Sequence, residues 1–278
     1  MRRLRISAIS YLNTAPLMWG FEHGKAGEDF EISYTVPSQC AAELAAGSAD
    51  IGIIPAAAYT TVADLLVIPG VAIAARQAVR SILLVSKVPL EKIQTVALDT
   101  SSLTSTALIK VLFSRWWGGQ RKFMAMEPDV DDMLRHADAG MVIGDPALKV
   151  DRSRYFAYDL AEEWARLTGQ PFVFAFWAVR QGALAEASSS LDLAKVFQSS
   201  RDHGLQPGNL ERIAKEWAPR VGLSEADVKQ YLTANIHYYL DPACLSGLQL
   251  FYRYAQECEA LPDGPELRFL NVARTAGL

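Results

Sequence analysis

The sequence predicts an α/β protein with mostly parallel sheets and a helical C-terminal third. Short apolar runs with strand character alternate with helical patterns as far as residue 180, which is typical of parallel βα units. Beyond that residue the patterns are nearly all helical. The 278 residues are also enough for two lobes with a substantial buried core.

Bulk composition argues against several classes of protein. The net charge of −4 comes without a basic stripe, so we expect no nucleic-acid partner. No apolar run reaches the roughly 18 residues of a membrane helix or forms a signal sequence, so we expect a cytoplasmic protein without a membrane partner. The three cysteines and four histidines show no metal-ligand spacing, so we expect no metal. The patterns do not indicate an oligomeric state.

The N-terminal part is predicted to alternate between strands and helices. Pro16 suits the first turn of a helix, and Ser38 and Gly47 suit the two ends of the next one. The predicted elements are, in order, a strand at Leu4–Ile9, a helix starting at Ala15–Phe21, a strand at Glu31–Val36, a helix from Ser38 to Ala46 and a buried strand at 49–55.

The middle of the chain repeats this organisation. Strands are predicted at Val67–Ala74, Ser81–Ser86 and 95–99, and the last of these leads into a helix at Thr104–Phe113. ELAAGSADIGIIPAA and MLRHADAGMVIGDPA both run from helix through a small-residue turn and an apolar strand to a loop with proline. Two similar α/β units are therefore expected, one after the other.

The C-terminal third follows a long apolar strand at 171–180 and carries clear helix start signals. Ser224 and Asp227 form a capping-box pattern. Asp241 followed by Pro242 is typical of an N-cap and a first helical residue.

Polar residues follow several of the predicted strands. In parallel α/β sheets, ligands bind at the carboxyl ends of the strands. Residues 10–13, Pro55 onward, residues 100–105 and Asp145 all occupy such positions. We therefore expect these segments to lie where a ligand binds.

The stretch DTSSLTST, residues 99–106, is the strongest local signal, because six of its eight residues are Ser or Thr. It stands at a predicted strand-to-helix junction, where unpaired N–H groups and the helix dipole favour a carboxylate or phosphate. It has no lysine and no Gly-x-Gly, so it is neither a P-loop nor a dinucleotide loop. A helix cap with solvated hydroxyls is the alternative interpretation.

Several further residues have both a binding and a structural interpretation. Arg80 can pair with a ligand carboxylate, but it alternates with Ser81 along a strand, so one of the two is expected to face the ligand. Asn13 can donate to or accept from a ligand oxygen, and it also suits a turn. Asp145 can orient a ligand hydroxyl or cap the next turn. Together they indicate a grip on a small anion, without an obvious nucleophile or cofactor loop.

A set of motifs runs in order along nearly the whole chain: ISYLNTAPL (9–17), GIIPAA (52–57), VRSILLVS (79–86), ALDTSSLTSTALIKVL (97–112), GDPAL (144–148), PFVFAFWAVR (171–180), and GLQLFYRYAQE followed by LRFLNV. In this combination the chain resembles the chorismate dehydratases of the futalosine route to menaquinone. SYLNTAPL and LDTSSLTS are its most specific parts. Leu103 departs from the pattern, because many members carry Arg there, so a cationic contact is missing or supplied elsewhere.

The resemblance implies a two-lobed type II periplasmic-binding-protein-like fold, the Venus flytrap, with a ligand cleft between the lobes. Lobe 1 is expected at residues 1–86 and 178–278, including the C-terminal helices, and lobe 2 at 87–177. The implied activity is that of a cofactor-independent hydro-lyase that converts chorismate to 3-[(1-carboxyvinyl)oxy]benzoate and water. A small-anion solute-binding protein, and the sister enzyme that splits cyclic dehypoxanthine futalosine, are the alternatives.

The resemblance also implies roles for the expected site residues. Asn13 and Ser81 are expected to be catalytic, with Asn13 holding either the departing hydroxyl or the enolpyruvyl carboxylate, and that carboxylate taking the proton from C3. One carboxylate of chorismate, the expected small-molecule partner, is expected at the start of the 104–113 helix. The expected substrate-binding residues are Ser10, Tyr11, Pro55, Arg80, Ser101, Ser102, Thr104, Ser105 and Asp145.

Overall fold

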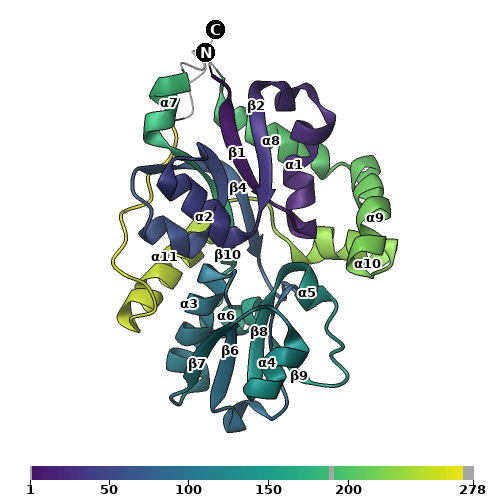
Figure 1. Cartoon of the computed structure of the whole chain (residues 1–278), viewed down its shortest axis with the longest axis vertical. Coiled ribbons are helices and arrows are strands. Elements are labelled where there is room, and N and C mark those ends of the chain that lie inside the picture. The colour runs from purple at the N-terminus through teal and green to yellow at the C-terminus, as the bar shows by residue number, and fades with distance from the viewer. Residues whose placement is uncertain (1, 188–190, 272–278) are drawn as a thin grey trace.

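A computed structural model describes residues 2–187 and 191–271, which form two lobes stacked along the long axis of the molecule (Figure 1). Each lobe is built on a five-stranded sheet, with strand orders β2-β1-β3-β10-β4 and β7-β6-β8-β5-β9. The strands are β1 (Leu4–Ile9), β2 (Phe30–Thr35), β3 (Ile51–Pro55), β4 (Leu65–Ala75), β5 (Ile82–Ser86), β6 (Thr95–Asp99), β7 (Lys122–Met126), β8 (Ala139–Ile143), β9 (Phe156–Asp159) and β10 (Phe172–Arg180).

Helices pack around both sheets and make up the C-terminal third. The α-helices are α1 (Ala15–His23), α2 (Pro37–Ala46), α3 (Leu103–Leu112), α4 (Val130–His136), α5 (Gly144–Leu148), α6 (Leu160–Thr168), α7 (Gln181–Ala187), α8 (Leu193–Gly204), α9 (Pro207–Val221), α10 (Glu225–Gln230) and α11 (Pro242–Glu257). Among the described residues, none of these is both long and apolar enough to cross a membrane.

Each sheet is mixed, with four strands in one direction and one reversed. The reversed strands are β10 in the first sheet and β5 in the second, each antiparallel to both of its neighbours. The other pairings are parallel. Each reversed strand is the first to follow a crossing from the other lobe, so it enters its sheet from the opposite end. The prediction of mostly parallel sheets is therefore confirmed for the direction of all the strands except β5 and β10.

The chain crosses between the lobes twice, between β4 and β5 and between α6 and β10. Because β5 pairs in the second sheet and β10 in the first, both crossings come earlier than the expected boundaries at 86/87 and 177/178. A continuous apolar strand carries no local signal of which sheet it joins. We propose residues 80–171 as lobe 2 and the rest as lobe 1, of which 188–190 and 272–278 lie outside the described residues.

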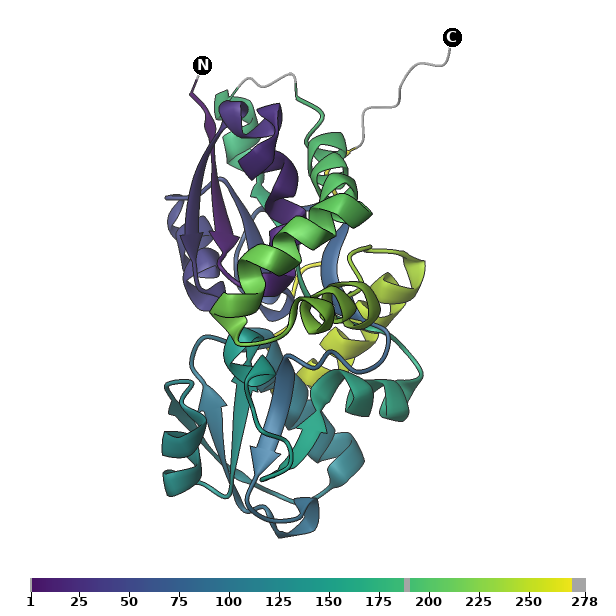
Figure 2. The same ribbon diagram turned by 90° about the vertical axis from the view of Figure 1, so that its right-hand side faces the viewer.

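Alternation of side chains along the strands places helices on both faces of the first sheet. A side chain at Gly52 would meet Cys40 and Leu44 of α2 on one face. On the other face, the Trp177 ring lies against Phe197 of α8. Figure 2 shows α8 and α9 along this side of the upper lobe, with α11 beside the junction of the two lobes.

The second sheet divides its apolar side chains between two cores. Leu83 and Val85 of β5 belong to a small core with Met133 and Leu134 of α4. Leu84, on the opposite face, belongs to the large core that continues into lobe 1. The two lobes therefore share one hydrophobic core on one side of the cleft.

The helix start signals are confirmed at both C-terminal positions. The Ser224 side chain accepts from the backbone N–H of Asp227, and Asp241 caps α11. The prediction was wrong for α2, which begins at Pro37 rather than behind a Ser38 cap, because proline's fixed φ and missing N–H suit the first helical position.

Candidate functional site

A cavity lies between the lobes, and its empty space, counted together with the solvent at its mouth, is about 480 Å³. Its wall comes from segments at the carboxyl ends of β1, β3, β6 and β8, as expected for an α/β fold. Six predicted site residues line it: Tyr11, Asn13, Pro55, Ser102, Thr104 and Ser105.

Apolar side chains make up much of the remaining wall. Ile73, Ile82, Ile143 and Phe174 contribute from both lobes. No Lys, Arg or His is among the described residues that line the cavity. Recognition of an anion here therefore depends on neutral donors, namely hydroxyls, side-chain amides and backbone N–H groups.

The start of α3 forms the hydroxyl-rich part of the wall. Ser102 is the N-cap, and its side chain accepts from the backbone N–H of Ser105 at 3.3 Å. This cap leaves Thr104 and Ser105 in the first turn, both buried and both at the cavity. Leu103, the position that departs from the family pattern, is exposed and lies outside the cavity wall.

Thr104 joins the two lobes through one hydroxyl group. Its Oγ1 accepts from the backbone N–H of Ala57 at 3.1 Å and donates to the backbone oxygen of Phe174 at 3.2 Å. The Thr104 side chain therefore holds the start of α3 against lobe 1.

A second set of contacts closes the other side of the cavity. The backbone N–H of Leu12 donates to Asp145 Oδ1 at 3.1 Å. The Tyr11 side chain lies close to Ser101 and to Gly144. Gly144 has a φ of 65°, so a residue with a side chain would be strained there as well as crowded. These contacts hold the lobes in a closed arrangement.

Ser101 and Asp145 stand behind the wall rather than in it. The Ser101 hydroxyl and N–H both donate to Asp99 Oδ1, at 2.6 and 2.8 Å. Burial raises the pKa of both Asp99 and Asp145. Asp99 Oδ2 is buried without a hydrogen-bond partner among the described residues.

Ser10 and Arg80 also lie outside the cavity wall. Ser10 is exposed, and its N–H donates to the backbone oxygen of Thr35. Arg80 has a left-handed φ of 65°, and its N–H donates to Asp159 at 2.6 Å. Its backbone oxygen accepts from Arg152. Arg80 thus forms a tight turn at the first crossing, and the arginine grip considered from sequence is absent from the described cavity wall.

Ser81 is fully buried beneath the cavity and does not line it. Its Oγ accepts from the hydroxyl of Tyr231 at 2.8 Å. Tyr231 begins η6 (Tyr231–Asn235), the π-helical turn after α10, and the Asn13 side chain lies near its hydroxyl. Burial raises the pKa of Tyr231, and the charge of Asp145 acts in the same direction.

Sequence reasoning missed Tyr231. The residue sits inside a helical pattern, where a tyrosine is typical of a packing face. A buried hydroxyl on a helix has no local sequence signal, because its partners come from segments far away in the chain.

One cluster outside the cavity has the side-chain types of a metal site. Ligand atoms of His237, Asp241 and Cys244 lie within 4.8 Å of one another. Asp241 already caps α11, and it contacts His237 at 2.8 Å and Arg76 at 2.7 Å. The described contacts therefore account for the cluster as a helix cap with an ion pair.

Comparison with known proteins connects the whole chain to menaquinone biosynthesis. A family model described as "Menaquinone biosynthesis" matches residues 4–257. A curated relative, the chorismate dehydratase of Thermus thermophilus, is 28% identical over an alignment of 283 residues that covers 95% of this chain and 98% of the relative.

Solved structures match in fold at lower identity. Protein AF1704 from Archaeoglobus fulgidus superposes with a TM-score of 0.69 at 14% identity, covering 93% of this chain and 98% of its own. The alkanesulfonate-binding protein SsuA from Xanthomonas axonopodis pv. citri gives 0.66 at 18% identity, with 94% of each chain covered. A Candida albicans protein with the generic periplasmic binding protein fold gives 0.62 at 12% identity, covering 98% of each chain. These likenesses confirm the two-lobed periplasmic-binding-protein-like fold.

Proposed function

The chain belongs to the menaquinone biosynthesis family, and on that premise we propose that it converts chorismate to 3-[(1-carboxyvinyl)oxy]benzoate and water. The observation that carries the proposal is the full-length likeness to a chorismate dehydratase, which covers 95% of the chain. The interlobe cavity supports it independently, because hydroxyl and amide donors face apolar walls there.

The cavity matches the chemical groups of chorismate. The substrate carries two carboxylates, one hydroxyl and a six-membered ring. The first turn of α3, with Ser102 and Ser105, offers donors and a positive dipole end to one carboxylate. Ile82, Ile143 and Phe174 offer apolar surface to the ring. In a site closed to bulk water, such neutral donors interact more strongly with an anion than they do in solution.

The reaction needs orientation more than it needs a strong base. The C3–H bond breaks, its electron pair enters the ring, and the C4–O bond breaks, so that the proton and hydroxide together make the water lost. The substrate's own enolpyruvyl carboxylate takes the C3 proton. Asn13, at the cavity wall, holds that carboxylate or the departing hydroxyl. Closure of the lobes excludes bulk water.

This balance defines the class of the proposed enzyme. Because the water lost is made from substrate atoms and the ring becomes aromatic, the step requires no oxidant or reductant. We therefore propose a cofactor-independent hydro-lyase with a small-molecule substrate, located in the cytoplasm.

The deciding experiment is incubation of the purified protein with chorismate, without added metal or cofactor, followed by chromatography and mass spectrometry. Enzyme-dependent loss of one water to give an aromatic enolpyruvyl ether supports the proposal. Unchanged chorismate that still protects the protein against heat indicates a solute-binding protein instead. If chorismate has neither effect, cyclic dehypoxanthine futalosine is the next substrate to test.

Asn13→Ala tests the assigned role within the same assay. The expected result is a folded protein that binds chorismate and has lost most of its turnover. Asn209→Ala, a half-buried position on α9 outside the cavity wall, is the matched control and should leave turnover unchanged. Full turnover by a folded Asn13→Ala protein would remove the proposed role of Asn13.

A further inference from the structure

We propose that Tyr231 is a positioning residue of this site, because its hydroxyl bonds Ser81 beneath the cavity and lies beside the Asn13 side chain at the cavity wall. The inference rests on the proposed function, and it adds a residue from the C-terminal helical region. Three segments far apart in the sequence meet at this one hydroxyl: the turn after β1, the first lobe crossing and η6.

The hydrogen bond of the Tyr231 hydroxyl is short and buried. It is donated to Ser81 Oγ at 2.8 Å. The Asn13 side chain lies near the same hydroxyl and acts to lower its pKa. Tyr231 therefore stands between Asn13 at the cavity wall and Ser81 beneath it.

Asn13 is also held by a contact of its own. Its Oδ1 accepts from the Thr14 hydroxyl at 3.3 Å. Asn13 is buried apart from its edge at the cavity. A substrate oxygen therefore meets a side chain that is packed in place before binding, which favours electrostatic stabilisation.

Tyr231 also connects the site to both lobes. Ser81 stands at the entry to β5, and its backbone oxygen accepts from the N–H of Gly144, beside the cavity. The negative charge of Asp145 is close enough to act on the Tyr231 hydroxyl. A shift of Tyr231 would therefore move Asn13 and the lobe 2 wall relative to each other.

Tyr238 provides a matched control for the burial of a tyrosine hydroxyl. Its side chain is as deeply buried as that of Tyr231, but its hydroxyl has no hydrogen-bond partner among the described residues. Removing the oxygen from Tyr238 leaves the contacts at Asn13 and Ser81 in place. Because the Tyr238 hydroxyl makes no hydrogen bond to the described residues, Tyr238→Phe controls for removal of a buried oxygen atom. A structural effect of losing the Ser81 contact should lower the thermal midpoint of Tyr231→Phe, whereas a positioning effect should lower its kcat at temperatures where it is folded.

The test measures kcat, KM and the thermal midpoint for wild type, Tyr231→Phe and Tyr238→Phe with chorismate as substrate. For Tyr231→Phe we expect kcat to fall by about tenfold or more while KM changes by less than about threefold, because the loss is of orientation rather than of binding. Tyr238→Phe should keep the wild-type kcat and KM. A folded Tyr231→Phe protein with wild-type kcat overturns the inference, as does an equal loss of kcat in both variants.

Ser81→Ala removes the hydrogen bond between Tyr231 and Ser81 by changing the acceptor. This variant tests the positioning role if Tyr231→Phe does not fold. We expect a fall in kcat with KM little changed, and in the double variant we expect losses that are smaller than the product of the single losses, because both act through one contact. A wild-type kcat in Ser81→Ala would count against a positioning role for this contact. Fully multiplicative losses of kcat in the double variant would do the same. If wild type itself does not dehydrate chorismate, the proposed function fails, and that result is separate from these comparisons.

Discussion

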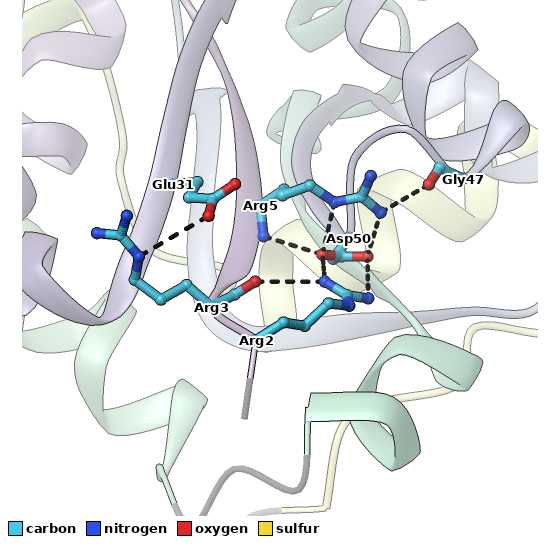
Figure 3. Close-up of polar contacts among 6 residues, drawn as sticks. All are labelled: Arg2, Arg3, Arg5, Glu31, Gly47 and Asp50. Atoms are coloured by element: carbon cyan, nitrogen blue, oxygen red, sulfur yellow. Dashed lines mark hydrogen bonds and ion pairs between the residues drawn. The ribbon is translucent and has the colours of Figure 1, made fainter.

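Asp50 allows the stability of the first lobe to be tested apart from the cavity. Its fully buried carboxylate accepts hydrogen bonds from the guanidinium groups of Arg2 and Arg5 and, at 2.9 Å, from the backbone N–H of Arg5 (Figure 3). Arg5 also donates to the backbone oxygen of Gly47 at the end of α2. One carboxylate therefore holds the N-terminal segment, β1 and the start of β3 together.

The effect of Asp50→Asn can be estimated from these contacts. Because the two arginine side chains are 37% and 36% exposed, each ion pair is discounted to about 1 kcal/mol. The NH₂ group of the new asparagine also faces N–H donors that the carboxylate accepts from in the wild type, and this unpaired contact costs about 1 kcal/mol. We therefore expect the free energy of unfolding to fall by about 3 kcal/mol. The kcat should stay unchanged, because Asp50 lies at the opposite end of β3 from Pro55.

The pH dependence of this effect has a definite sign. Burial alone would raise the pKa of Asp50, but the hydrogen bonds from Arg2 and Arg5 outweigh it and hold the pKa well below its usual range. The contribution of a carboxylate with a lowered folded pKa is present above its unfolded pKa of about 3.9 and is lost as the pH falls through the folded pKa. The difference between wild type and Asp50→Asn should therefore shrink below about pH 4.

Urea unfolding of both proteins from pH 3 to pH 7 measures the effect. Glu31→Gln is the control, because the Arg3–Glu31 pair is long, at 3.8 Å, and more than half exposed on both sides. This control should change the free energy of unfolding by less than about 0.5 kcal/mol. Equal stabilities for Asp50→Asn and Glu31→Gln at pH 7, or a difference that grows as the pH falls, would refute the reasoning.

Three further substitutions test the site and its electrostatics. Thr104→Val removes both hydrogen bonds of the hydroxyl that joins the lobes. The free energy of unfolding in urea should fall by about 2 kcal/mol, and KM for chorismate should rise. Unchanged values of both quantities would contradict the role of Thr104 between the lobes. Gly144→Ala adds a Cβ 2.8 Å from the Tyr11 ring at a left-handed φ. Thermal melts should therefore show a lower melting temperature, and assays a lower turnover. A fully active, equally stable variant would show that a side chain is tolerated at this position. Burial raises the pKa of Asp99 above its unfolded value, so its charge costs stability as the pH rises through the folded pKa. Asp99→Asn should therefore give a flatter dependence of melting temperature on pH above about pH 4, where the unfolded carboxyl is ionised, and an unchanged slope would exclude this assignment.

Much of the cavity wall was predictable because its signals are local. The Ser102 cap, the first turn of α3 and the polar turn after β1 each depend on a few neighbouring residues. Strand ends and helix starts follow from apolar alternation and capping chemistry, which act over short distances along the chain. The position of these segments at the carboxyl ends of strands then follows from the α/β class.

Other features depend on which distant segments meet, and no short stretch encodes that. β5 and β10 are apolar except at their last residues, Ser86 and Arg180, so their pairing partners and reversed direction follow from the two lobe crossings. Arg80 is occupied in a turn because Asp159 lies against its N–H, and the hydroxyl of Ser81 meets Tyr231 from 150 residues further along the chain. Local patterns determined the α/β class, several helix ends and the polar residues that line the cavity. Packing between remote elements decided the direction of the crossing strands and which polar side chains reach the cavity, because burial and hydrogen-bond satisfaction depend on all the surrounding segments together.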